Sequence, residues 1–281
     1  MTRFRKTIRA VQLDLSLVLL GTAGLVFRNA LDTNMGAYVG LDFGHYVAAT
    51  RRWLETGSPY LPLELAGPFQ YSDLTFIHPP IALVLFAPFL VLPALLFWIL
   101  PIAGTLAVIL SWRPSRWTWP VMALFLNWPH FAGALIVGNS NLWACFFIAA
   151  GLRLGWPILF LAVKPSLAPF VLAGLPGLFG RREGRVTLVR DRARSAAIVT
   201  IAMIVAAALL GGLWVEWLIV LDNSPGDLSY SIAAVPWISV PIVAWLGRTR
   251  PAEYAQPATT PVAPSVAMTH SLGQSDGSSR S

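Results

Sequence analysis

The sequence has little charge for its length of 281 residues. Charged residues make up 12% of the chain, whereas hydrophobic residues make up 56%. Soluble domains usually contain about 25% charged residues. No acidic residue occurs between positions 74 and 180. A soluble protein would need charge on every surface element, so this scarcity argues against one and favours a protein with most of its helices in a bilayer.

Cysteine and histidine are also scarce. The single Cys145 lies in an apolar run, so no internal disulfide can form. Four scattered histidines have no metal-ligand spacing, and we expect neither a metal site nor a cofactor. The chain contains no Walker loop, no dinucleotide-binding glycine pattern and no Gly-x-Ser-x-Gly elbow. The sequence therefore gives no sign of a nucleotide-binding enzyme or a serine hydrolase.

The positive charge of the chain is unevenly distributed. The formal net charge is +7, but basic residues gather at the ends of apolar runs, where the positive-inside rule places them. We therefore expect no nucleic-acid partner. The N-terminus contains Arg3, Arg5, Lys6 and Arg9, and segment 181–195 contains six arginines. Both stretches are predicted to be cytoplasmic.

Long apolar runs recur over residues 1–250 and predict an all-α, polytopic helical membrane domain. We expect about eight membrane segments in a plasma-membrane protein, with both termini in the cytoplasm. Prolines divide the apolar stretch that begins at Pro79. Several segments are short enough to be re-entrant rather than spanning. The expected segments are 13–31, 80–92, 94–112, 117–135, 140–153, 155–179, 196–220 and 229–247.

Residues 28–78 form the longest hydrophilic connection in this domain, and we expect them at the outer face. Within this loop, the stretch GLDFGHYVAATRRWLETGSPY (40–60) has apolar residues at helical spacing and polar residues between them. This pattern predicts a helix that lies in the membrane interface, ended by Gly57-Ser58-Pro59. Residues 251–281 are rich in Pro, Ser, Thr and Ala and predict a disordered cytoplasmic tail.

Asp42 stands at the start of the predicted interfacial helix and has two interpretations. An aspartate in this position can be an N-cap, because its carboxylate accepts the free backbone N–H groups of the first turn. It can also be a general base that the helix holds just outside the bilayer.

Lys164 is one of two lysines in the chain, and it lies far from either end of an apolar run. A lysine in the middle of a membrane helix costs about 2.5–3.5 kcal/mol on insertion scales, so we interpret it as functional. The alternative is a side chain that reaches the interface. Pro165 follows it and should disrupt the helix, which would open the chain toward a polar cavity.

Four short motifs follow one another along the chain and together resemble glycosyltransferase family 87. These enzymes are membrane mannosyltransferases of the C-type glycosyltransferase fold that use polyprenyl-phosphate sugars. The resemblance covers roughly residues 12–220. The chain is short for this family, and the distance between the last two motifs is compressed, as in a shortened member. The motifs are Asp42-Phe43 with Tyr46, Ala48-Ala49, Gly57 and Pro59-Tyr60; FIHPPIALVLFAPFLVLP (76–93); Gly138-Asn139 with Asn141; and Lys164-Pro165.

The resemblance implies transfer of a hexose, mannose in the family, from a polyprenyl-phosphate donor to a hydroxyl of a glycolipid or glycan acceptor at the outer face. Asp42 would be the catalytic base, and Asp32 is a second candidate that lacks the following motif. Lys164 would hold the donor phosphate. A carboxylate that removes the proton from a sugar hydroxyl contributes about 10²–10⁴-fold. A phosphate leaving group needs cations and N–H donors.

The other candidates are substrate-binding residues, each with a second interpretation. His78 could donate to the phosphate or the sugar, or could be an ordinary interfacial histidine. Asn139 and Asn141 could bind sugar hydroxyls or cap the next helix. Arg51 and Arg52 could guide the donor phosphate, although contacts with solvent or lipid headgroups are the simpler interpretation. The full set of substrate-binding candidates is Tyr46, Arg51, Arg52, His78, Asn139, Asn141 and Lys164.

Two other classes of protein fit the composition. The first is a non-catalytic, degenerate membrane protein of the same fold that binds lipid-linked sugar. The second is a small-molecule transporter, which should show inverted repeats and paired broken helices. The sequence shows neither of these features, so the transporter ranks last.

Overall fold

The computed structural model describes residues 39–70, 72, 74–154, 156–174, 203–224 and 229–249, with isolated positions at 21, 24, 197, 200 and 201. Over these residues the chain is mostly helical and contains no β-strand, as the all-α prediction requires. The predicted first segment (13–31), the basic stretch 181–195 and the predicted tail (251–281) lie outside the described residues, apart from the isolated positions.

The described helices are mostly short. The segment predicted at 80–92 forms a short α-helix followed by a 3₁₀ turn. The described elements, with η for 3₁₀-helices, are α2 (Leu41–Thr56), α3 (Pro62–Ala66), α4 (Ala82–Phe86), η2 (Ala87–Leu90), α5 (Leu96–Trp112), α6 (Thr118–Leu126), α7 (Pro129–Val137), α8 (Asn141–Leu154), η3 (Trp156–Val163), η4 (Pro165–Gly174), α10 (Leu213–Asn223), α11 (Ser229–Ile238) and α12 (Val240–Leu246).

Three of the predicted segments are each divided in two. The prediction of one continuous helix is therefore wrong for 196–220 and for 229–247, and the apolar run 117–135 also forms two helices. Run 117–135 bends by 64° between α6 and α7, where Pro129 starts a new helix. Run 196–220 bends by 84° at Gly211, which has φ 37°, and its neighbour Gly212. Run 229–247 breaks at Ser239, one residue before Val240 and Pro241 start α12. Proline lacks the N–H that continues a helix, and glycine adopts positive φ readily.

Run 155–179 differs in another way, because its described part is 3₁₀ rather than α-helical. It forms η3 and η4, which are separated at Lys164. Pro157, Pro165 and Pro169 each remove a backbone donor from this stretch. The break that Pro165 predicted next to Lys164 is therefore present.

Across the described part of the chain, no helix is by itself both long and apolar enough to span a bilayer. Two bent helix pairs satisfy the length and composition criteria together. They are Thr118–Leu126 with His130–Val137, and Met203–Leu209 with Leu213–Asn223.

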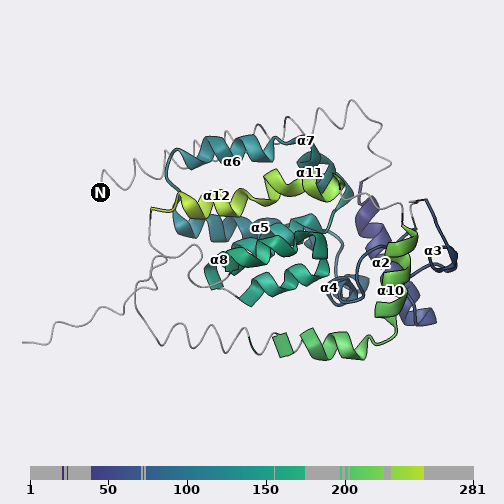
Figure 1. The fold of residues 1–281 in the computed structure, drawn as a ribbon. Coiled ribbons are helices and arrows are strands. Elements are labelled where there is room, and N and C mark those ends of the chain that lie inside the picture. The colour runs from purple at the N-terminus through teal and green to yellow at the C-terminus, as the bar shows by residue number, and fades with distance from the viewer. Residues whose placement is uncertain are drawn as a thin grey trace, which may run out of the picture. The chain divides into compact units, whose positions relative to one another are not determined.

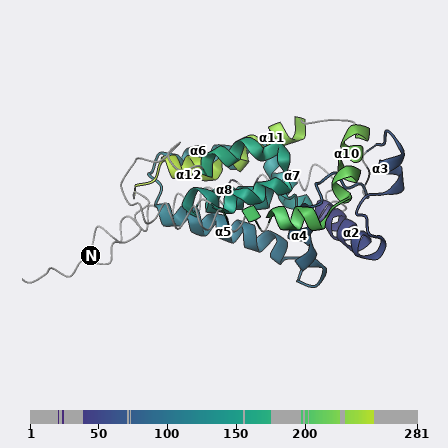
Figure 2. The same cartoon turned by 60° about the horizontal axis from the view of Figure 1, so that its bottom comes forward.

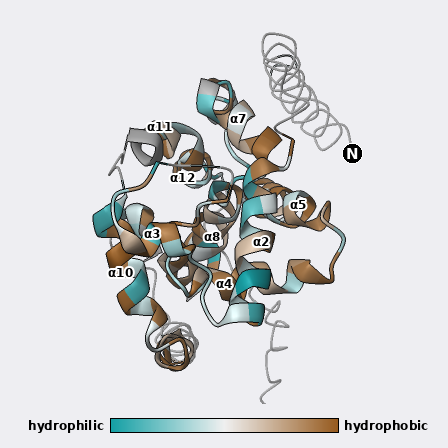
Figure 3. Ribbon diagram, turned by 90° about the vertical axis from the view of Figure 1, so that its right-hand side faces the viewer, coloured by the Kyte–Doolittle hydropathy of each residue, from teal (hydrophilic) through white to brown (hydrophobic). Residues whose placement is uncertain are grey.

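Helix α8 lies at the centre of the helical body. It packs against α5, η3, η4 and α12, and ten of its 14 residues are buried. Figure 1 and Figure 2 show α5, α8 and α12 running alongside one another, with α6 and α11 beside them and α2, α3 and α10 together at the other end. Figure 3 shows hydrophilic residues along α2 and α10, whereas α5 is mainly hydrophobic. Helices α2, α3 and α10, which contain most of the charged residues of the described helices, therefore lie at one end of the body, which we call the polar end.

A buried carboxylate holds this polar end together. Glu64 of α3 is fully buried, and its two oxygens accept the backbone N–H groups of Leu61 and Phe76. The backbone carbonyl of Glu64 accepts a hydrogen bond from Asn223 at the end of α10, at 2.9 Å. Because a buried carboxylate is stable only when its oxygens are bonded, these contacts fix the chain between α2 and α4 against α10.

Candidate active site

Helix α2 brings Asp42 to the turn between α7 and α8. The helix starts after Gly40, which has φ 73° and donates its N–H to the carbonyl of Ile136 at 2.9 Å. Gly40 is the N-cap, and no side chain caps this helix, so the interpretation of Asp42 as the N-cap is wrong. The Asp42 carboxylate lies in the first turn of α2 and does not cap the helix. The predicted end at Gly57 is confirmed, with φ 88° there.

Asn139 connects Asp42 to the start of α8. Its amide nitrogen donates to Oδ2 of Asp42, across 97 positions of sequence. Its amide oxygen accepts the backbone N–H of Asn141 at 2.9 Å, as a helix-capping side chain does. Asn139 thus caps α8 and orients the Asp42 carboxylate at the same time. A buried side chain with both ends bonded in this way is well suited to position a catalytic carboxylate.

Tyr46 lies one turn after Asp42 and makes the second polar contact with the α7–α8 turn. Its hydroxyl accepts the backbone N–H of Ser140 at 3.2 Å, and its ring stacks on Phe86 with 4.3 Å between centroids. Tyr46 is buried, and its contacts with Ser140 and Phe86 hold the start of α2 in place. The ring of His78 meets it edge-on at 5.1 Å.

The short segment that contains His78 is held by its backbone. The carbonyl of Ile77 accepts a hydrogen bond from the indole of Trp217 at 3.1 Å. The carbonyl of His78 accepts one from the hydroxyl of the buried Tyr60 at 2.9 Å. These bonds fix the histidine beside Tyr46 without using its imidazole.

The imidazole of His78 is neutral at pH 7. Burial, and then the positive charge of Lys164, lower the pKa of His78 to about 3, although a hydrogen bond to the backbone of Val163 opposes the shift. A neutral imidazole has one N–H and one acceptor nitrogen. Since the bond to the Val163 carbonyl uses the N–H, the other nitrogen can accept a hydrogen bond from a hydroxyl. This arrangement suits a sugar hydroxyl better than a phosphate.

Lys164 reaches the same place from the break between η3 and η4. It is half-buried, and its charge acts on both Asp42 and His78. The chain therefore brings together residues from four separate segments. The five sequence-predicted site residues that meet here are Asp42, Tyr46, His78, Asn139 and Lys164.

The surroundings of Asp42 raise the pKa of its carboxyl group. Burial raises the pKa of the Asp42 carboxyl, and the hydrogen bond from Asn139 and the charges of His45 and Lys164 lower it by less, so the pKa lies above its ordinary value. A raised pKa makes the carboxylate a stronger base, as general base catalysis needs. Burial and the hydrogen bond from Asn139 thus give Asp42 the properties that a general base needs.

Three predicted site residues are not part of this group. Arg51 is exposed. Arg52 donates to the carbonyls of Pro59 and Leu74, so its guanidinium ties down the chain after α2. Asn141 is fully buried, and its side-chain amide has no hydrogen-bond partner among the described residues. Its side chain is turned into the helical body.

Glu216 is not among the residues predicted from the sequence. Its carboxylate accepts a hydrogen bond from the Ser58 hydroxyl at the end of α2. A signal for it exists in the sequence. Glu216 is the only charged residue in the run 196–220, and an isolated ionisable residue in such a run is a functional candidate. Trp53, which lies within the predicted interfacial helix, and Glu216 line one hollow between the end of α2 and the start of α10.

The site shows no arrangement suited to a metal ion. Within the described ranges, no group of three or more His, Cys, Asp and Glu side chains is close enough to hold one.

Comparison of the chain with models of protein families, with curated protein sequences and with solved structures gives no match in any of the three.

Proposed function

We propose that this protein is a membrane glycosyltransferase that moves a hexose, mannose by its family resemblance, from a polyprenyl-phosphate donor to an acceptor hydroxyl. The acceptor is a glycolipid or glycan at the outer face of the plasma membrane, and both termini are cytoplasmic. One observation carries the proposal. Asp42, oriented by Asn139, lies in the electrostatic field of Lys164.

The proposed reaction is a single displacement. The Asp42 carboxylate takes the proton of the acceptor hydroxyl, whose oxygen attacks the anomeric carbon of the donor. The bond between that carbon and the phosphate oxygen breaks, and its electron pair leaves with the polyprenyl phosphate. Lys164 stabilises the negative charge that develops there. Attack from the face opposite the leaving group inverts the anomeric configuration.

The exposed apolar surface of the helices supports a location in the membrane. Large apolar side chains are exposed on the helices of the body, among them Leu124 of α6 at 68% and Ile99 of α5 at 45% exposure. Extended apolar surfaces of this kind mark contact with lipid or with another protein. The polar end that contains α2, α3 and α10 would then lie at the outer face, beside the lipid that holds the polyprenyl chain.

A comparison of lipid-linked and nucleotide-linked sugar donors tests this function most directly. We expect membranes that express the protein to transfer radiolabelled mannose from polyprenyl-phosphate-mannose and not from GDP-mannose. A lipid donor keeps its chain in the bilayer while its phosphate meets Lys164. Transfer from the nucleotide sugar would contradict the proposal. Specific binding of the lipid donor without transfer would instead indicate the non-catalytic protein of the same fold.

The pH dependence of transfer reports on Asp42. The base acts only when ionised, so we expect activity to fall as the pH drops through the pKa of Asp42, which burial raises. Replacing Asn139→Ala removes a hydrogen bond that favours the ionised form, so the pKa should rise further and the acid limb should move to higher pH. The measurement is the pH–rate profile of both proteins.

Asn127→Ala is the matched control for this profile. Asn127 donates to the carbonyl of Ala123 at the end of α6, so its loss should leave the acid limb in place. An acid limb that moves to lower pH in Asn139→Ala, or does not move, would contradict the role of Asn139.

A further inference from the structure

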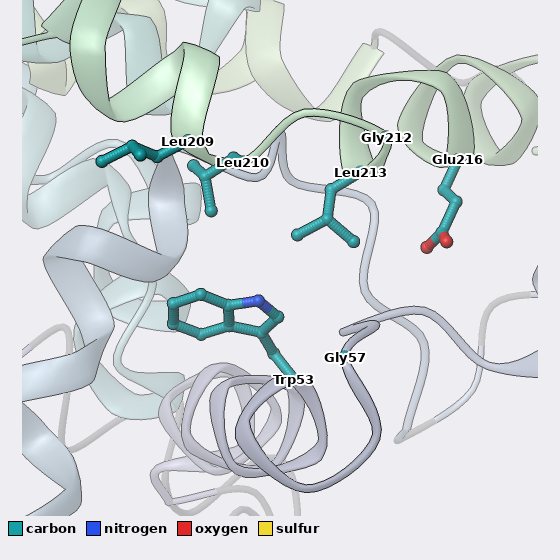
Figure 4. Close-up of a pocket in the computed structure, with 7 residues that line it drawn as sticks. All are labelled: Trp53, Gly57, Leu209, Leu210, Gly212, Leu213 and Glu216. Atoms are coloured by element: carbon teal, nitrogen blue, oxygen red, sulfur yellow. The ribbon is translucent and has the colours of Figure 1, made fainter.

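A hollow separate from the Asp42 site lies where the end of α2 faces the start of α10. Its volume is about 340 Å³, and Trp53, Gly57, Leu213 and Glu216 line it. Figure 4 shows the Trp53 indole rising from α2 toward Leu209 and Leu210, and Glu216 pointing toward the loop at Gly57. Ligand pockets span about 300–1,000 Å³, so this one suits a small unit such as a single sugar ring.

The lining combines an aromatic face with a fixed carboxylate. The Ser58 hydroxyl donates to Oε2 of Glu216 and holds the carboxylate in place. A carboxylate has about four acceptor positions, so Glu216 keeps the capacity to accept hydroxyl groups of a ligand. The π-face of Trp53 is electron-rich and attracts partly positive groups, such as the C–H groups on the face of a sugar.

The position of this hollow relative to Asp42 follows from the helix that they share. Asp42 and Trp53 are 11 residues apart in α2, which at 3.6 residues per turn places them on the same face of the helix. At 1.5 Å per residue they are about 16 Å apart along the axis. A single hexose ring cannot touch both residues. A sugar in the hollow is therefore a different unit from the one that reacts at Asp42.

We propose that the hollow lined by Trp53 and Glu216 is a subsite for a distal sugar unit of an oligosaccharide acceptor. Trp53 stacks on the ring and Glu216 accepts its hydroxyls. This inference rests on the proposed function for the identity of the ligand as an acceptor. It adds that the acceptor is bound beyond its reacting sugar, so that a longer glycan gains a contact which a monosaccharide acceptor lacks.

Acceptors of two lengths test the subsite. Trp53→Leu and Glu216→Gln, each in the full chain, are assayed with octyl mannoside and with an octyl-linked mannotetraose. For the tetraose, we expect KM to rise about tenfold, the effect of one lost stacking contact or hydrogen bond, with kcat unchanged. For the monosaccharide, KM should not change because it does not reach the hollow. Trp117→Leu and Glu55→Gln, which alter exposed side chains elsewhere, are the matched controls.

Direct binding separates this inference from the proposed function. Titration calorimetry of free mannotetraose with the purified protein in nanodiscs should give weaker binding for Trp53→Leu and Glu216→Gln than for wild type. Asp42→Asn should bind as wild type does. If no variant transfers sugar but the two hollow variants lose binding, the subsite stands and the proposed transfer reaction fails.

The opposite results would overturn the subsite. Wild-type KM and affinity in both hollow variants would do so, even if transfer itself is observed. Binding of tetramethylammonium in place of mannotetraose would also overturn it, because an aromatic ring with a carboxylate can recognise a quaternary ammonium ion. The sugar is favoured here because a single indole lines the hollow, whereas ammonium ions are held by cages of several rings.

Discussion

Replacing Asp42→Asn should lower sugar transfer by about 10²–10⁴-fold, the contribution of a positioned general base. Asparagine has nearly the shape of aspartate, and its amide oxygen can still accept the hydrogen bond from Asn139. The fold should therefore be preserved while the proton acceptor is lost. The measurement is transfer of radiolabelled mannose from polyprenyl-phosphate-mannose in membranes with equal amounts of each protein.

Glu55→Gln is the control for the loss of a carboxylate from the same helix. Glu55 is exposed near the end of α2, so transfer should be unchanged. In Asp42→Asn, the KM for the lipid donor should remain close to that of wild type, since the base acts on the acceptor. Equal rates for Asp42→Asn and wild type would remove Asp42 from the mechanism.

Replacing Gly138→Ala should destabilise the protein and disturb the site together. Gly138 has φ 71°, where a residue with a Cβ atom loses about 1–2 kcal/mol. A Cβ atom there would lie 2.5 Å from Cζ2 of Trp98 and 3.0 Å from Cβ of Phe43. Trp98 cannot easily move away, because its indole donates to the carbonyl of Leu135 at 2.7 Å. Crowding of this kind adds about 1–3 kcal/mol.

The expected loss from both causes is about 2–5 kcal/mol in the free energy of unfolding. Thermal unfolding in detergent should show a clear decrease in midpoint. Transfer should also fall, since Gly138 precedes the residue that orients Asp42. Gly133→Ala is the control, because its Cβ would meet nothing within 4 Å, and alanine favours a helix by up to about 1 kcal/mol. An unchanged midpoint in Gly138→Ala would show that the α7–α8 turn tolerates a side chain.

Much of the local structure could be predicted from the sequence. The interfacial pattern at 40–60 corresponds to α2, and the glycine at position 57 ends it, because periodicity and glycine conformation are properties of neighbouring residues. The helices predicted at 94–112 and 140–153 are present as α5 and α8. The helix breaks within 196–220 and 229–247 were less predictable, because hydropathy alone does not indicate that a helix ends at the glycine pair 211–212 or at Ser239.

The sequence by itself determined the helical class, the scarcity of charge and the choice of Asp42 and Lys164 as unusual residues, since each depends only on composition and local pattern. Only the tertiary structure decided which side chains meet. A hydrogen bond from Asn139 to Asp42 joins residues 97 positions apart and exists only because α2 packs against the α7–α8 turn. The same packing half-buries Asp42 and raises its pKa. A separate long-range contact, between α10 and the chain that follows α2, brings Glu216 to Ser58. Burial and long-range contact are set by packing, and no local pattern encodes them.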